Sequence, residues 1–121
     1  MAKPFSIGTR EVEGVTVFDV EGELDLSTAP KLCGRIDQAF KGRGPRVLVD
    51  LTKLEFCDST GLRALFGTVQ EARVRRAPLR IVQPTSPAAA RVFDLVGAAE
   101  FLPLVDETET GLAQLARALR S

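Results

Sequence analysis

Three consecutive side chains that carry oxygen atoms, Asp58, Ser59 and Thr60, precede a glycine at the start of a segment with helical periodicity. Asp, Ser and Thr are the residues that most often cap a helix N-terminus, so ordinary capping explains the triplet without any chemistry. The same position also favours chemistry, because the backbone N–H groups and the dipole at a helix N-terminus stabilise an added phosphate. Ser59 is therefore a candidate phosphoacceptor, and from the residues alone both roles stay open.

Other kinds of chemistry find little support in the sequence. The chain contains no histidine, which excludes Ser-His-Asp and Cys-His arrangements and removes the commonest general base and metal ligand. The glycines of Gly42-Arg43-Gly44 do not form a phosphate-binding loop. Acidic residues gather in segments 21–25 and 106–109, where they suit the N-termini of helices. We therefore expect no catalytic residue, no metal site and no cofactor.

A phosphoacceptor aspartate of the response-regulator type is a further alternative, because Asp50 ends an apolar strand-like run over residues 47–49. Such a site needs an acidic pair after the first strand, to hold Mg²⁺, and a lysine at the end of the last strand. Neither is visible in the sequence, which argues against a receiver domain.

Charge and hydropathy limit the classes of partner. Sixteen basic residues balance 16 acidic ones, so no overall field draws the chain to nucleic acid. No apolar run approaches the roughly 20 residues that span a bilayer, and the first ten residues lack the apolar core of a secretory signal. We therefore expect a cytoplasmic protein with no direct membrane insertion, in which Cys33 and Cys57 fill the core without a disulfide.

Hydrophobic periodicity predicts the elements that position these residues. Alternation around residues 5–9 and 15–20 indicates a hairpin, and segments 47–49 and 79–82 are typical of buried strands. A last strand is expected to open at Phe101-Leu102. Apolar spacing and capping residues predict helices that begin near Ser27-Thr28, Asp58, Ser86-Pro87 and Asp106–Thr110, the last with an apolar face that ends at Leu119.

Strands that alternate with helices after a hairpin predict an α/β fold with a mostly parallel sheet, an N-terminal antiparallel hairpin and about four helices. At 121 residues, the chain 1–121 is expected to be one domain. Loops at the carboxyl ends of adjacent parallel strands share one edge of a sheet. The loops that carry Asp25 and Ser59 should therefore be neighbours.

Several ordered motifs resemble one family. They are Gly22-Glu23-Leu24-Asp25 before the first helix, Val47-Leu48-Val49-Asp50-Leu51 as the central strand, and Phe56-Cys57-Asp58-Ser59-Thr60-Gly61-Leu62 at the second helix. Thr85-Ser86-Pro87 and the segment 92–97 continue the likeness. Together they resemble the STAS domain, and specifically the stand-alone anti-sigma factor antagonists.

The resemblance implies a regulator of transcription, of the partner-switching type used in stress responses, that is not an enzyme. In its unphosphorylated form such a protein binds an anti-sigma factor that is also a serine kinase, and so releases a sigma factor. Phosphorylation at the position of Ser59, with Thr60 as the fallback, ends the complex, and a phosphatase of the PP2C type resets it. The resemblance also implies partner-binding positions at Leu24, Asp25, Thr28, Asp58, Thr60, Gly61 and Leu62.

An alternative within the same family is a STAS subunit of a membrane transport complex, which would use the same edge without a phosphorylation switch. Weak nucleotide hydrolysis is a further alternative that no phosphate-binding motif supports. We expect a monomer or a weak dimer.

Overall fold

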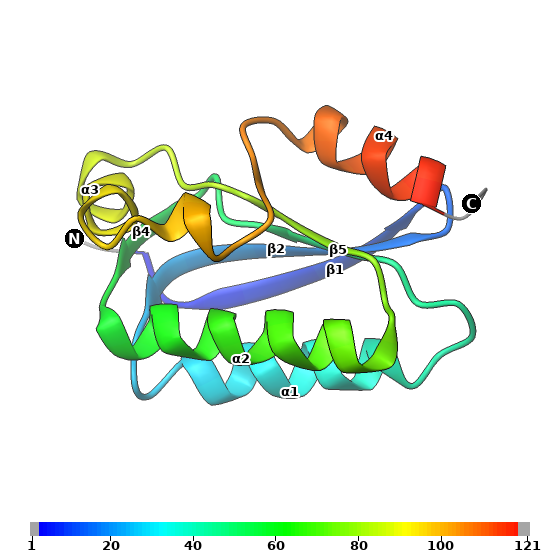
Figure 1. Cartoon of the computed structure of the whole chain (residues 1–121). Helices are drawn as coiled ribbons and strands as arrows, with labels where there is room; N and C mark the ends of the chain where they lie inside the picture. Colours follow the sequence, from blue (N-terminus) through cyan, green and yellow to red (C-terminus); the bar gives the residue numbers. More distant parts are fainter. Residues whose placement is uncertain (1–2, 119–121) are drawn as a thin grey trace.

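The computed structural model describes residues 3–118, in which six strands form one mixed sheet (Figure 1). Strands β1 (Ser6–Val12) and β2 (Val15–Leu24) form the expected antiparallel hairpin. The remaining strand pairs are parallel, and the order across the sheet is β1-β2-β3-β5-β6. The bounds of these further strands are Val47–Asp50 for β3, Leu79–Val82 for β5 and Leu104–Val105 for β6. The predicted α/β class, with a mostly parallel sheet, is confirmed.

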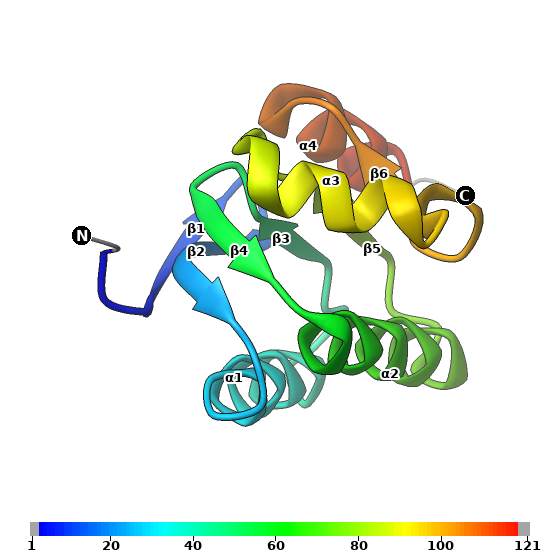
Figure 2. The ribbon, with the colours of Figure 1, turned by 90° about the vertical axis from the view of Figure 1, so that its left-hand side faces the viewer.

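Two pairs of helices cover the two faces of the sheet (Figures 1 and 2). Helices α1 (Ala29–Phe40) and α2 (Ser59–Arg75) lie side by side on one face. Helices α3 (Pro87–Leu95) and α4 (Thr108–Ala118) lie on the other, with α3 against β4 (Leu54–Cys57) and α4 against β3 and β5. The predicted four helices are thus present, and Leu119, expected on the face of the last one, lies outside the described residues.

Strand β3 lies at the centre of the sheet and is buried along its whole length. Val47 and Val49 belong to the larger apolar cluster, which α1 and α2 cover. Leu48 points the other way, into a smaller cluster with Leu115 of α4. Burial on both faces explains why this strand is a continuous apolar run in the sequence.

Strand β4 was not predicted from the sequence. It has only four residues, two of them buried, and it pairs in parallel with the last residues of β2, beyond the point where β3 ends. The long strand β2 therefore serves two partners in succession, β3 along its middle and β4 at its end.

The expectation that the last strand opens at Phe101-Leu102 is wrong. These residues follow a short 3₁₀ helix, η1 (Ala98–Glu100), and the N–H of Leu102 donates to the carbonyl of Ala98 at 2.8 Å. This turn-like hydrogen bond keeps the segment out of the sheet, and the strand begins two residues later as β6. No helix within residues 3–118 is long and apolar enough to cross a membrane.

Leu48→Ala is expected to lower the free energy of unfolding by about 2–5 kcal/mol, because it opens a cavity in the cluster that holds α4 on the sheet. Val74→Ala is the control, since Val74 is 79% exposed and its truncation should change stability by less than about 0.5 kcal/mol. Urea denaturation measures both. Equal stabilities for the two variants would contradict the assignment of Leu48 to the core.

Candidate functional site

The start of α2 shows which of the three oxygen-bearing residues caps the helix. Asp58 is the N-cap, and its Oδ1 accepts a hydrogen bond from the N–H of Gly61 at 2.9 Å. Ser59 is the first helical residue, is exposed, and makes no side-chain hydrogen bond within residues 3–118. Thr60 is half-buried. Capping therefore needs Asp58 alone and leaves the Ser59 hydroxyl available.

The start of α2 lies directly against the end of β2. The N–H of Asp58 donates to the carbonyl of Leu24 at 3.2 Å, beside the parallel pair that Leu24 forms with Cys57. Gly61 approaches the same carbonyl so closely that a Cβ atom there would collide with the Leu24 oxygen. The prediction that the Asp25 and Ser59 loops are neighbours is confirmed, because both follow the ends of the paired strands β2 and β4.

The loop between β2 and α1 is held together by the Asp25 carboxylate. Its Oδ1 accepts hydrogen bonds from the N–H of Ser27 at 3.0 Å, the hydroxyl of Ser27 at 2.9 Å and the N–H of Thr28 at 3.1 Å. The hydrogen bond from the Ser27 hydroxyl is the largest contribution that lowers the pKa of Asp25, and the bonds from Thr28 add to it.

Thr28 corrects one expectation from the sequence. It occupies the N-cap position of α1, but its side chain makes no cap hydrogen bond to that helix. The Thr28 hydroxyl instead donates to the carbonyl of Glu23 at 2.8 Å and accepts from the N–H of Asp25 at 2.9 Å. The side chain thus closes the loop onto the end of β2 rather than capping α1.

The seven partner-binding positions that the resemblance implies fall into two groups, half-buried and buried. Asp25, Thr28, Asp58 and Thr60 are half-buried and present polar atoms at the edge of the sheet. The other three are buried beneath them: Leu24, Gly61 and Leu62.

Two residues at the same edge were missed. Leu26 is 74% exposed in the loop after β2, and Arg63 is exposed on the first turns of α2. Both line a hollow of about 290 Å³ between α1 and α2, together with Pro30, Thr60 and Ala64. The only signal in the sequence is one leucine within an otherwise polar loop.

The two cysteines are free thiols, as expected, but the expectation that both fill the core is wrong for Cys33, which is half-buried on α1. Cys57 is buried under the start of α2, where desolvation, followed by the charge of Asp58, raises its pKa to about 12. Its thiol therefore stays protonated at neutral pH. The Sγ atom would lie 3.0 Å from a Cβ on Gly61, so Cys57 serves as a packing residue under the helix start.

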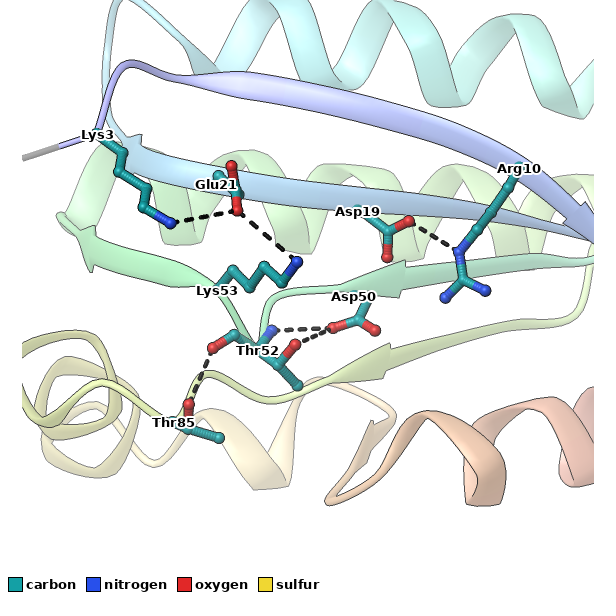
Figure 3. Close-up of polar contacts among 8 residues, drawn as sticks. All are labelled: Lys3, Arg10, Asp19, Glu21, Asp50, Thr52, Lys53 and Thr85. Carbon is teal, nitrogen blue, oxygen red and sulfur yellow. Dashed lines mark hydrogen bonds and ion pairs between the residues drawn. The ribbon is translucent and has the colours of Figure 1, made fainter.

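A second group of charged residues lies on the sheet face that carries α3 and α4 (Figure 3). Arg10 pairs with Asp19 at 2.9 Å, and Glu21 lies 3.9 Å from the ammonium groups of both Lys3 and Lys53. Ion pairing thus accounts for the charges drawn on β1 and β2.

Asp50 is 6% exposed. Its carboxylate accepts hydrogen bonds from nearby residues, and those from Thr52 are drawn in the same view. Its Oδ1 accepts from the N–H and the hydroxyl of Thr52 at 3.0 and 2.7 Å, and its Oδ2 accepts from the hydroxyl of Thr108 at 2.7 Å. These bonds tie the end of β3 to α4, which agrees with the exclusion of a receiver-type phosphoacceptor. Within residues 3–118 no group of three or more acidic or cysteine side chains could hold a metal ion.

Comparison with known proteins gives one consistent family. Residues 6–111 match the family model described as the STAS domain. The anti-sigma-B factor antagonist of Listeria monocytogenes is 29% identical over 98 residues, which cover 81% of this chain and 84% of that protein.

Solved structures give the same result for the fold. An anti-sigma factor antagonist from Mycobacterium paratuberculosis superposes with a TM-score of 0.80 at 26% identity, covering 95% of this chain and 98% of the other. The Bacillus cell fate determinant SpoIIAA in its phosphorylated form superposes with a TM-score of 0.62 at 20% identity, covering 88% and 96%. The resemblance stated from the sequence motifs is therefore confirmed over nearly the whole chain. The relatives from Listeria and Mycobacterium are both named as anti-sigma factor antagonists, the class that the sequence motifs resemble.

Gly61→Ala is expected to destabilise the protein by about 1–3 kcal/mol, because the new Cβ would collide with the backbone of Leu24, which cannot move without breaking the pairing of β2 with β4. Gly67→Ala in the same helix is the matched control. Nothing lies within 4 Å of a Cβ at Gly67, so this variant should be stabilised by up to about 1 kcal/mol through helix propensity. Thermal and urea unfolding distinguish the two, and equal shifts would contradict the close approach at Gly61.

The side-chain pKa of Asp25, measured by NMR titration, is expected to lie below the ordinary value for aspartate and to rise in Ser27→Ala, which removes the largest stabilising hydrogen bond. Because the folded-state pKa is lowered, the contribution of Asp25 to stability is present above the unfolded pKa and is lost as the pH falls through the folded value. Identical midpoints in the wild type and Ser27→Ala would refute this role of Ser27.

Proposed function

The chain belongs to the STAS domain family, and we propose that it is an anti-sigma factor antagonist whose binding is switched off by phosphorylation of Ser59. The unphosphorylated form binds an anti-sigma factor with serine-kinase activity and so frees a sigma factor for transcription. The kinase, which binds ATP and Mg²⁺, transfers the γ-phosphate to Ser59 and thereby ends the complex. A phosphatase of the PP2C type removes the phosphate and restores the binding form.

The single observation that carries this proposal is the free hydroxyl of Ser59. Asp58 caps α2, and Ser59 is exposed at the helix N-terminus, where its hydroxyl makes no hydrogen bond to the residues that the structure describes. Phosphorylation there leaves the fold intact, because the helix dipole and the first N–H groups of α2 favour a negative group. The phosphorylated form of SpoIIAA, which shares this fold, supports the same modification here.

The electrostatic surroundings explain how a phosphate would act on a partner. It would add about −1.5 to −2 charges at pH 7 to an edge that already carries the carboxylates of Asp58 and Asp25. A partner packed against this edge would have to bury an uncompensated dianion. A loss of only about 1.4 kcal/mol weakens binding tenfold, so the added charge is sufficient for a switch.

Accessibility favours Ser59 over Thr60 as the acceptor. Ser59 is exposed, whereas Thr60 is half-buried and lines the hollow between α1 and α2. A kinase active site needs to enclose the attacking hydroxyl, which only the outward-facing residue offers without a change in the helix. Thr60 remains the fallback acceptor.

We assign the partner contacts to the polar rim of the edge: Asp25, Thr28, Asp58 and Thr60. Leu24, Gly61 and Leu62 support this rim from below, since their burial leaves little surface for a partner. In this proposal the whole chain is a single cytoplasmic STAS domain that acts as a monomer or a weak dimer.

Mass spectrometry of the protein purified from its native host, together with a pull-down, tests the switch. We expect the mass spectrum to show phosphate on Ser59. In the pull-down, the wild type and Ser59→Ala should retain an ATP-binding anti-sigma factor, and Ser59→Asp should retain at least tenfold less of it. Gln70→Glu is the charge control, because Gln70 is exposed farther along α2 and its substitution adds the same negative charge away from the edge. It should bind as the wild type does.

Three outcomes would contradict the proposal in different ways. Phosphate on Thr60 alone would move the acceptor to the fallback position. An unmodified Ser59, with a transport ATPase captured equally by all variants, would make the chain a STAS subunit of a membrane transport complex. Equal release by Ser59→Asp and Gln70→Glu would show a general effect of charge instead of a switch at Ser59.

A further inference from the structure

We propose that the hollow beside Ser59 anchors the anti-sigma factor by receiving one apolar side chain that is flanked by a carboxylate. We call it the Leu26–Arg63 hollow, and it is the one lined by Leu26, Pro30, Cys33, Thr60, Arg63 and Ala64. This inference rests on the proposed function and adds the chemistry that selects the partner. None of the positions implied by the family resemblance includes Leu26 or Arg63.

Leu26 is a large apolar side chain held out into solvent. It is 74% exposed, although the residues on both sides of it are tied down. The Asp25 carboxylate accepts hydrogen bonds from the N–H groups of Ser27 and Thr28, and the hydroxyl of Thr28 donates to the carbonyl of Glu23. These bonds hold the backbone of the loop, so a contact made by Leu26 costs little further loss of backbone entropy.

The walls of the hollow are apolar on both sides. Pro30 contributes from α1 and Ala64 from α2, and the small side chain of Ala64 leaves the hollow open between the helices. Cys33, which is half-buried, also lines the hollow, and its Sγ is 3.8 Å from the carbonyl oxygen of Ala64. Because the wall residues offer few hydrogen-bonding groups, the hollow fits an apolar side chain better than a polar one.

Arg63 supplies the charge at the rim. It is exposed and makes no ion pair or side-chain hydrogen bond within residues 3–118. Arg75, farther along the same helix, shows the contrast, because it pairs with Glu71 at 2.6 Å. An unpaired guanidinium beside an apolar hollow is complementary to a partner carboxylate next to an apolar side chain.

The location of the hollow identifies its occupant. Thr60 lines it and is the next residue after Ser59, so a protein seated in the hollow lies beside the phosphoacceptor. An occupant that senses the state of Ser59 is by the proposed function the anti-sigma factor. A second copy of the chain is the competing occupant, because Phe101 is 54% exposed and follows the exposed Glu100.

Titration calorimetry with the anti-sigma factor identified in the pull-down, produced and purified separately, tests the proposal. Leu26→Ala is expected to raise Kd at least tenfold, which corresponds to about 1.4 kcal/mol. Arg63→Glu should weaken binding by at least as much, and Arg63→Ala should reduce the salt dependence of Kd.

Matched controls separate these effects from general loss of apolar or positive surface. Val74→Ala removes a side chain that is 79% exposed at the far end of α2, and Arg91→Glu reverses an exposed charge on α3. Both are expected to leave Kd within twofold of the wild type. The variants at these four positions should unfold at the same midpoint as the wild type, because each of the four side chains is exposed.

The outcomes distinguish this proposal from the proposed function. If Ser59→Asp abolishes binding while Leu26→Ala and Arg63→Glu bind as the wild type does, the switch stands and the anchor is refuted. If the wild type binds no anti-sigma factor, both proposals fall. If sedimentation of the protein alone shows a dimer that Leu26→Ala and Arg63→Glu dissociate, the hollow serves a second copy and the assignment to the anti-sigma factor is overturned.

Discussion

The contact between the end of β2 and the start of α2 is the constraint on which the candidate site depends. The carbonyl of Leu24 accepts the N–H of Asp58, and the absence of a side chain at Gly61 lets the helix approach that same carbonyl. This close approach restricts how the start of α2 can lie against the end of β2. The exposed direction of Ser59 follows from this approach, since Asp58 is fixed at the cap and Ser59 is the next residue.

Two loops with different internal chemistry share that edge of the sheet. The first is organised by the Asp25 carboxylate, whose hydrogen bonds go to its own loop, and the second by the Asp58 carboxylate, which caps α2. Both carboxylates are thereby held with little freedom to move. In the proposed switch, a phosphate on Ser59 would alter the charge of this surface rather than its shape, so the fold would be preserved.

The opposite face shows what a charged cluster looks like when its role is structural. Asp50 is buried and accepts a hydrogen bond from Thr108. It also accepts from Thr52, and Asp19 pairs with Arg10 (Figure 3). These groups satisfy one another and hold α4 and the hairpin in place. The side chains of Ser59 and Arg63 differ, because they make no hydrogen bond or ion pair with the described residues. This difference distinguishes residues that are candidates for binding a partner from residues that stabilise the fold.

Local pattern by itself determined the α/β class, the hairpin, the central position of β3 and the start of α2, because each depends on the spacing of apolar residues or on a capping residue nearby in sequence. The sequence also placed Ser59 within the family motif, but it could not tell a cap from a free hydroxyl. Only the tertiary structure decided that question, and it also decided that Thr28 closes a loop, that the last strand begins at Leu104, and that Leu26 and Arg63 share one hollow. The hollow depends on residues that are far apart in the chain. The other outcomes depend on hydrogen bonds between near neighbours, and apolar periodicity does not encode which of several polar groups makes each bond.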